Sequence, residues 1–98
     1  MVKLVVSKGT AKNKKWKAEF FDDKGKRIKV SQFGDSRYSD YTIHKDKDRR
    51  ERYRSRHKVY LKDQNYMSPA YLSYYILWGD STSLKTNISN YKKKFNLK

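Results

Sequence analysis

The sequence predicts an α+β domain, with a small three-stranded antiparallel sheet in its N-terminal half and about three helices in its C-terminal half. In the first half, apolar residues alternate with charged ones, which is the period of half-buried strands. In the second half, apolar residues recur at helical spacing, and Ser, Pro and Gly stand where helices usually begin and end. A chain of 98 residues is long enough for a single domain, residues 1–98, with a modest core.

Three short strands are expected in the N-terminal half. Residues 3–6 are β-prone, and residues 16–20 and 28–31 alternate between apolar and polar side chains. The Asp-Asp-Lys-Gly sequence between the last two segments predicts a tight turn in which Gly supplies a left-handed backbone. We therefore expect a meander with one lysine-rich face and one apolar face, to which Ile28 and Val30 contribute.

The first helix is expected over the basic segment 45–58, which consists of good helix formers without Gly or Pro. Thr42 is the expected N-cap, because a side-chain oxygen there can accept from free amides of the first turn. Three ring side chains recur at helical spacing and should form the inward stripe of this helix: Tyr53, His57 and Tyr60.

Two more helices should follow a loop over residues 62–67. Ser68 and Pro69 begin the second helix, because Ser can cap it and Pro fits its first position. This helix carries Trp78, should end at Gly79 in a left-handed conformation, and should form the centre of the core. The last helix begins after a Ser-Thr-Ser sequence. Its apolar stripe consists of residues at helical spacing: Leu84, Ile88, Tyr91 and Phe95.

Positive charge is concentrated at both ends of the chain as well as in the basic segment. The formal net charge is +15, and neither residues 1–18 nor residues 81–98 contain an acidic residue. Such a field attracts nucleic acid, anionic membrane surfaces or acidic proteins. We expect the extreme ends, residues 1–15 and 96–98, to be loosely held.

The basic segment 45–58 holds eight Lys or Arg residues against three acidic ones. The acids meet bases about one turn on, and the expected pairs are Asp46 with Arg50, Asp48 with Arg52, and Glu51 with Arg54. One interpretation is a solvated helix laced with these pairs. The other is a surface that binds an acidic partner, because the charge imbalance extends beyond the helix. The predicted partner-binding residues form one main face and one supporting face of the helix: Lys47, Arg50, Arg54 and Lys58, then Arg49, Arg52 and Arg56.

Aromatic residues beside the basic segment allow two interpretations. Tyr38, Tyr41 and Tyr60 flank this segment, and Trp16 lies among lysines near the N-terminus. Rings interleaved with cations suit nucleobase stacking next to phosphate contacts. A small domain also needs aromatic side chains in its core, and both roles stay open.

The sequence offers no catalytic, cofactor-binding or metal-binding set. His44 and His57 are the only histidines, their spacing is not that of a zinc site, and no glycine-rich phosphate loop occurs. The absence of cysteine excludes disulfides and is consistent with an intracellular protein. Apolar runs fall short of the ~20 residues that a membrane-spanning helix needs. We expect a non-enzymatic protein without cofactor, metal, small-molecule substrate or membrane insertion.

One block, Tyr-Ser-Asp-Tyr-Thr-Ile-His-Lys-Asp at residues 38–46, is unusual in composition. Shorter segments accompany it: Phe33-Gly34, Arg49-Arg50 to Tyr53, Arg56-His57, Ile76 to Gly79, and Tyr91 to Phe95. Together these segments resemble a family of small uncharacterised basic proteins encoded by large double-stranded DNA viruses, notably those of algae. The resemblance runs from about Trp16 to Phe95 and implies a viral setting without assigning an activity.

Two roles fit a cationic, non-enzymatic domain in that setting. The first is a minor capsid or virion component that bridges acidic surfaces of capsid proteins, which charge pairing within the basic helix favours. The alternative is sequence-nonspecific binding of nucleic acid, in which the basic helix contacts the packaged viral genome. A third class, an adaptor that binds an acidic host protein, stays open. The expected location is the virion, and otherwise the interior of the infected host cell.

Overall fold

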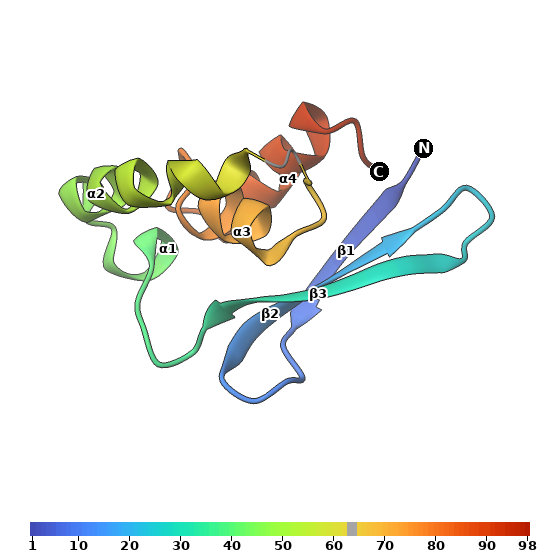
Figure 1. The fold of residues 1–98 in the computed structure, drawn as a ribbon, viewed down its shortest axis with the longest axis horizontal. Coiled ribbons are helices and arrows are strands. Elements are labelled where there is room, and N and C mark those ends of the chain that lie inside the picture. Colours follow the sequence, from blue (N-terminus) through green and yellow to red (C-terminus); the bar gives the residue numbers. More distant parts are fainter. Residues whose placement is uncertain (63–64) are drawn as a thin grey trace.

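The structure is a computed structural model that describes residues 1–62 and 65–98. The predicted α+β class is confirmed, because the N-terminal half forms an antiparallel sheet and the C-terminal half forms helices that cover one face of it (Figure 1). The sheet has the order β1–β2–β3, with β1 at Lys3–Lys8, β2 at Lys14–Phe21 and β3 at Arg27–Asp35. The molecule is elongated, with extents of 42 × 27 × 24 Å.

The turn between β2 and β3 forms as the sequence predicts. A carboxylate oxygen of Asp22 accepts from the backbone amides of Lys24 at 3.0 Å and Lys26 at 2.9 Å. Gly25 has a φ of 81°, a left-handed conformation that a residue with a Cβ adopts only with strain. This turn closes the β2–β3 hairpin, which extends away from the helices at one end of the molecule (Figure 1).

The face of β3 that meets the helices is the opposite of the one expected. Ile28 and Val30 are exposed, whereas Ser31 and Phe33 are buried. Successive side chains of a strand point to opposite faces, so the large ring of Phe33 fixes which face is inward. Ser31 is tolerated there because its hydroxyl donates to the backbone oxygen of Met67 at 2.6 Å. The uncovered face of the sheet is consequently partly apolar.

The two ends of the chain lie side by side and are not loose (Figure 1). The backbone amide of Leu4 donates to the oxygen of Lys98, and the amide of Lys98 donates to the oxygen of Val2, both at 2.9 Å. The side chain of Leu97 is buried. The expectation of loosely held ends, residues 1–15 and 96–98, is therefore wrong: β1 is a full member of the sheet and the C-terminus pairs with its beginning.

The basic segment forms two helices instead of the single helix expected over 45–58. Helix α1 spans Tyr41–His44, and helix α2 spans Lys47–His57. Between them Lys45 adopts a left-handed conformation with a φ of 57°, which ends the first helix. A short 3₁₀ segment, η1 at Lys58–Leu61, continues from α2. The chain direction thus changes immediately before the densest cluster of arginines.

Two aspartates cap these helices, and the expected cap at Thr42 is wrong. The carboxylate of Asp46 accepts from the amides of Asp48 at 3.0 Å and Arg49 at 3.2 Å at the start of α2. The carboxylate of Asp40 accepts from the amide of Thr42 at 2.9 Å at the start of α1. A negative side chain at an N-terminus also complements the helix dipole, which the Thr hydroxyl cannot do.

The helix expected at the centre of the core is present in two parts. Helix α3 spans Pro69–Leu72, and the π-helical segment η2 follows at Ser73–Leu77. Ser68 caps α3 as predicted, accepting from the amide of Tyr71 at 3.3 Å. The predicted core position of this segment is confirmed by its buried apolar side chains, Leu72, Ile76, Leu77 and Trp78. The loop expected over 62–67 includes residues 63–64, which lie outside the described residues.

Position 79 requires Gly because a side chain does not fit there. The left-handed conformation predicted for Gly79 at the end of the helix is wrong. The φ of Gly79 is not among the positive ones, but a Cβ at this position would lie 2.2 Å from the backbone oxygen of Tyr75. Buried Asn87 crosses the same place, donating from Nδ2 to the backbone oxygens of Ile76 at 2.9 Å and Ser81 at 2.7 Å. This contact joins the residues after η2 to the last helix.

Helix α4 at Leu84–Lys94 agrees with the prediction of a final amphipathic helix. Ser83 caps it, accepting from the amide of Thr86 at 3.2 Å. The expected stripe packs against the core, with Tyr91 fully buried and its other members partly buried: Leu84, Ile88 and Phe95. Helix α4 therefore completes the layer that covers the inner face of the sheet.

Candidate anion-binding cleft

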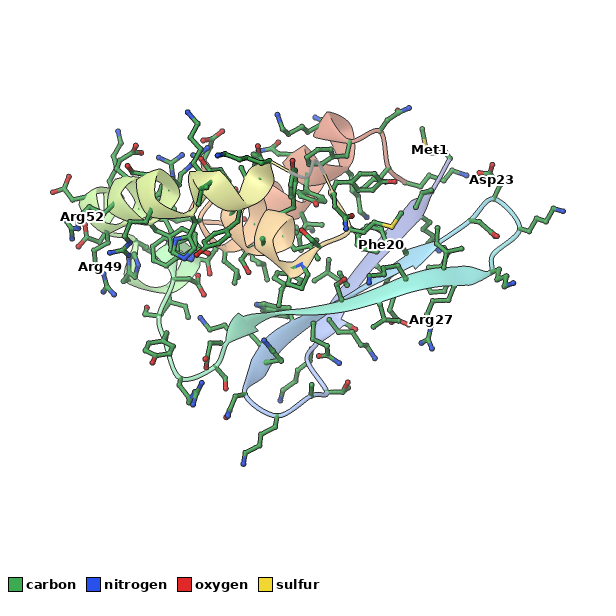
Figure 2. All side chains as sticks on the ribbon, in the orientation of Figure 1. Met1, Phe20, Asp23, Arg27, Arg49 and Arg52 are labelled. Atoms are coloured by element: carbon green, nitrogen blue, oxygen red, sulfur yellow. The ribbon has the colours of Figure 1, made fainter. Side chains whose placement is uncertain are left out.

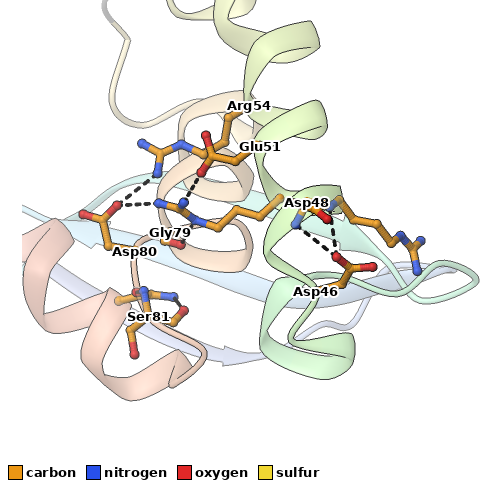
Figure 3. A network of polar contacts seen from close by, with 10 residues as sticks. Asp46, Asp48, Glu51, Arg54, Gly79, Asp80 and Ser81 are labelled. Atoms are coloured by element: carbon orange, nitrogen blue, oxygen red, sulfur yellow. Dashed lines mark hydrogen bonds and ion pairs between the residues drawn. The ribbon is translucent and has the colours of Figure 1, made fainter.

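Arg50 and Arg54 of α2 hold the helix to the residues that follow η2. The guanidinium of Arg50, which is 8% exposed, donates to the backbone oxygen of Gly79 at 2.6 Å and to Asp80 at 2.6 Å, and it also pairs with Glu51. Arg54 donates to the same oxygen of Asp80 at 3.0 Å. Figure 3 shows this network from close by. The hydrogen bond from Arg54 and the charges of both arginines lower the pKa of Asp80.

These contacts tie Arg50 and Arg54 into the fold, although the sequence analysis places both among the predicted partner-binding residues. Both guanidinium groups also lie over rings, Arg50 at 5.4 Å from the centroid of Tyr41 and Arg54 at 4.9 Å from that of Tyr74. Their expected partners were Asp46 and Glu51 on the same helix; instead Asp80, far along the chain, draws both inward. Of the three pairs expected within the helix, none is among the ion pairs of the described residues.

A stack of three rings supports α2 from below. Tyr53 lies between Trp78 and His57, with ring centroids 4.1 Å and 3.9 Å away and interplanar angles of 7° and 14°. Burial raises the pKa of the Tyr53 hydroxyl to about 12. The inward orientation predicted for Tyr53 and His57 is confirmed, whereas Tyr60 is 60% exposed and does not belong to the stripe. We call Trp78, Tyr53 and His57 the aromatic stack.

Three arginines of α2 remain, and they line one cleft between α2 and the end of the sheet. Arg49, Arg52 and Arg56 border a cleft of about 640 Å³ together with Lys14 and Lys15 of β2. No ion pair links any of the three arginines to another described residue. Figure 2 shows Arg49 and Arg52 at the α2 end of the molecule, away from Arg27 at the hairpin end. We call Arg49, Arg52 and Arg56 the free arginines.

The remaining predicted cations do not enter this cleft. Lys47 is exposed at the first turn of α2 and is not among the residues that line the cleft. Lys58 lines a separate depression beside Arg50 and Arg54. The structure therefore brings together three of the seven predicted partner-binding residues, and it adds Lys14 and Lys15 of β2, which lie just before the strand expected over residues 16–20 and were not among the predicted partner-binding residues.

The wall of the cleft opposite α2 carries two acidic residues, and both are paired. Asp40 is buried and accepts from Nζ of Lys15 at 2.5 Å. Asp35 accepts from Arg37 at 2.7 Å, and hydrogen bonds from the side chain and backbone of Arg37 lower the pKa of Asp35 to about 2. Lys14 has no ion pair with a described residue. Unpaired charge in the cleft is consequently positive.

The floor of the cleft is largely apolar. It is formed by residues from β3, α3 and the residues at the end of η2: Phe33, Gly34, Pro69, Ala70, Ser73, Leu77 and Trp78. Gly34 has a φ of 77°, and a Cβ there would lie 2.7 Å from the side chain of Leu77. Tyr38 stands in the loop after β3, also lines the cleft and is 68% exposed. The cleft thus combines a cationic rim with an apolar floor and an accessible ring.

His44 lies next to this region but does not line the cleft. Its Nδ1 accepts from the amide of Asp46 at 2.9 Å, which places the proton of the neutral ring on Nε2. Burial, followed by the charge of Arg49, lowers the pKa of His44. Its Nε2 is buried without a hydrogen-bond partner among the described residues. The ring packs against Trp78 at 5.2 Å between centroids, so a structural role accounts for its position.

The described residues contain no group of His, Cys, Asp or Glu side chains that could hold a metal ion. In the same part of the chain, no helix has the length and apolar character needed to cross a membrane. The cleft itself is lined by arginine and lysine donors beside an apolar surface.

Comparison with known protein families gives a match to part of the chain. A model for a family of unknown function, DUF5754, matches residues 4–57, which is more than half of the chain. The chain belongs to this family. The matched segment contains the whole sheet, α1 and α2, and so includes the free arginines and both lysines of the cleft, whereas Leu77 and Trp78 of the floor lie beyond it. No curated protein and no solved structure matches the chain.

Proposed function

We propose that the protein is a non-enzymatic nucleic-acid-binding protein whose cleft holds phosphate groups without reading base sequence. The observation that carries the proposal is the position of the free arginines, which line one cleft and have no ion pair with another described residue. Guanidinium groups match phosphate oxygens in a two-pronged geometry and remain charged at any physiological pH. Such groups left unpaired in a hollow favour a ligand that brings negative charge.

The arrangement of the free arginines favours a repeating anion over a single carboxylate. Arg49 and Arg56 are seven residues apart on one helix, which corresponds to about 10.5 Å along its axis, and Arg52 lies between them. Lys14 faces this row from the sheet side of the cleft. A chain of phosphates can contact several of these cations at once, whereas an isolated carboxylate would satisfy one or two. The cations thus follow the pattern of a phosphate backbone.

The salt dependence of binding tests this proposal. If Arg49, Arg52, Arg56 and Lys14 each neutralise one phosphate of a single strand, the logarithm of the affinity should fall with the logarithm of salt concentration at a slope of about −2.8. Replacing the free arginines together by Gln should weaken binding at ~50 mM salt by about 30-fold or more and reduce the slope to about −0.7.

The matched control removes three cations elsewhere. Lys24, Lys26 and Lys29 are exposed near the hairpin end and have no ion pair with a described residue. Replacing them by Gln changes the net charge by the same amount, yet should alter affinity by less than about threefold, because long-range attraction is screened beyond a Debye length of roughly 14 Å at ~50 mM salt. Equal losses in the two triple variants would show that diffuse charge, and not the cleft, binds nucleic acid.

A second candidate is a minor virion component that bridges acidic surfaces of capsid proteins. The observation that favours it is the uncovered face of the sheet, where Ile28 and Val30 are exposed close to the cationic side chain of Arg27. Apolar side chains ringed by charge are common at protein interfaces. This candidate requires that the protein stay with shell proteins when virions are gently disrupted, and that Val30→Glu abolish that retention. Release with the genome would count against it.

A further inference from the structure

We infer that the cleft takes an unpaired nucleotide of a single-stranded nucleic acid, with its base on the apolar floor and its flanking phosphates on the free arginines. This inference rests on the proposed function and adds to it the form of the ligand. The chemistry of the cleft is divided: Pro69 and Ala70 contribute accessible apolar surface to the floor above the buried side chains of Phe33 and Leu77, and cations stand around it. A nucleotide has the same division between a flat base and a charged backbone.

The size of the cleft fits part of a single strand. At about 640 Å³ it lies within the range of about 300 to 1,000 Å³ that is usual for small-ligand pockets. It is bounded on one side by α2 and on the other by the ends of β2 and β3. A base still paired in a duplex has both faces stacked on its neighbours, so it can lie flat on this floor only after leaving its partner, and that step costs free energy that a single strand does not need.

The aromatic residues inside the cleft are covered by one another, whereas the ring at its mouth is accessible. Trp78 and Tyr53 are already stacked on each other, and His57 covers the other face of Tyr53, so the faces of Tyr53 are not free for a base. Tyr38 has an exposed ring at the mouth, with the guanidinium of Arg37 at 5.9 Å from its centroid. A second base can stack on this ring, which requires no sequence preference because every base has a flat face.

The experiment compares three probes of equal length: a thymidine 12-mer, a uridine 12-mer and a 12-base-pair duplex. The protein carries Trp16→Phe, because Trp16 does not line the cleft and its removal leaves Trp78 as the only tryptophan. We expect both single strands to bind at least about tenfold more tightly than the duplex and to change the fluorescence of Trp78. A difference between the two single strands shows that the cleft distinguishes the sugar 2′-hydroxyl or the C5 methyl group of thymine, and either order supports the inference.

Tyr38→Ala provides a second test that does not endanger folding, because this side chain is exposed. It should weaken binding of the thymidine 12-mer by about tenfold, the size of one lost stacking contact, and leave duplex binding unchanged. Equal affinity for single strands and duplex, with a loss in both when the free arginines are replaced, would overturn this inference and leave the proposed function standing. Absence of binding to all three probes at ~50 mM salt would overturn both.

Discussion

Replacing Arg50 by Met should unfold the protein at a much lower temperature while leaving the charge of the cleft intact. The side chain is 8% exposed and donates to the backbone oxygen of Gly79 at 2.6 Å in a buried contact. Met fills a similar volume but leaves that oxygen without a partner, which costs about 1 to 3 kcal/mol. The lost contact with the ring of Tyr41, at 5.4 Å, adds about 0.5 to 1 kcal/mol.

The ion pairs of Arg50 contribute less than their number suggests. The side chains of Glu51 and Asp80 are 61% and 82% exposed, so both carboxylates are hydrated when the guanidinium is removed. Pairs of this kind are worth about 1 kcal/mol or less. The sum is a loss of about 3 kcal/mol in the free energy of unfolding, which corresponds to a fall of roughly 12 to 24 °C in melting temperature for a domain of this size.

Urea and thermal denaturation measure the stability of this variant, and binding of the thymidine 12-mer at a temperature where it is folded measures its function. Arg52→Met is the matched control, because Arg52 lies on the same helix, lines the cleft and has no ion pair with a described residue. It should change stability by no more than about 0.5 kcal/mol and weaken binding severalfold. If Arg50→Met kept the wild-type stability and lost as much affinity as Arg52→Met, the division of roles between these arginines would be refuted.

Three further outcomes follow from the packing. Gly79→Ala should destabilise the fold by about 3 kcal/mol or prevent folding, because its Cβ would lie 2.2 Å from the backbone oxygen of Tyr75; a wild-type denaturation midpoint would contradict this. Trp78→Ala should lower the free energy of unfolding by about 3 to 5 kcal/mol, and a folded variant that has lost only binding would mean that Trp78 is not part of the core. Burial raises the pKa of Tyr53 to about 12, so its contribution to stability is complete below pH 10 and is lost as the pH rises to about 12. Stability curves of wild type and Tyr53→Phe should therefore diverge between these two pH values, and parallel curves would rule out the shift.

The sequence predicts the two faces of the basic helix but not which of them points inward. At about 100° per residue, Arg49, Arg52 and Arg56 fall within about 60° of one another, and Arg50 and Arg54 within about 40°. Both faces carry only cations at these positions, so hydrophobic periodicity cannot distinguish them. The distinction comes from Asp80, which is 30 residues from Arg50 in the chain and accepts hydrogen bonds from both Arg50 and Arg54. No local pattern contains that information.

The buried face of β3 was mispredicted for a related reason. Ile28 and Val30 form a regular alternation, and so do Ser31 and Phe33, with the opposite parity. The apolar content of the first pair is higher, yet the second pair is buried because the helices cover that part of β3 and the first pair lies toward the free hairpin. Caps, by contrast, depend on residues within one turn of each other, which is why Ser68 and Ser83 could be predicted from the sequence.

A single short segment, residues 78–80, determines how α2 presents its free arginines. Trp78 stacks beneath Tyr53, the next residue accepts from Arg50 through its backbone, and Asp80 accepts from both Arg50 and Arg54. Helix α2 is therefore held through Tyr53, Arg50 and Arg54, while the free arginines have no ion pair with another described residue. Cations fixed in this way lose little backbone freedom when they meet a phosphate, and less of the attraction is spent on ordering the protein. In the proposed function, Arg50 and Arg54 would therefore contribute to binding by positioning their neighbours, without contacting the ligand themselves.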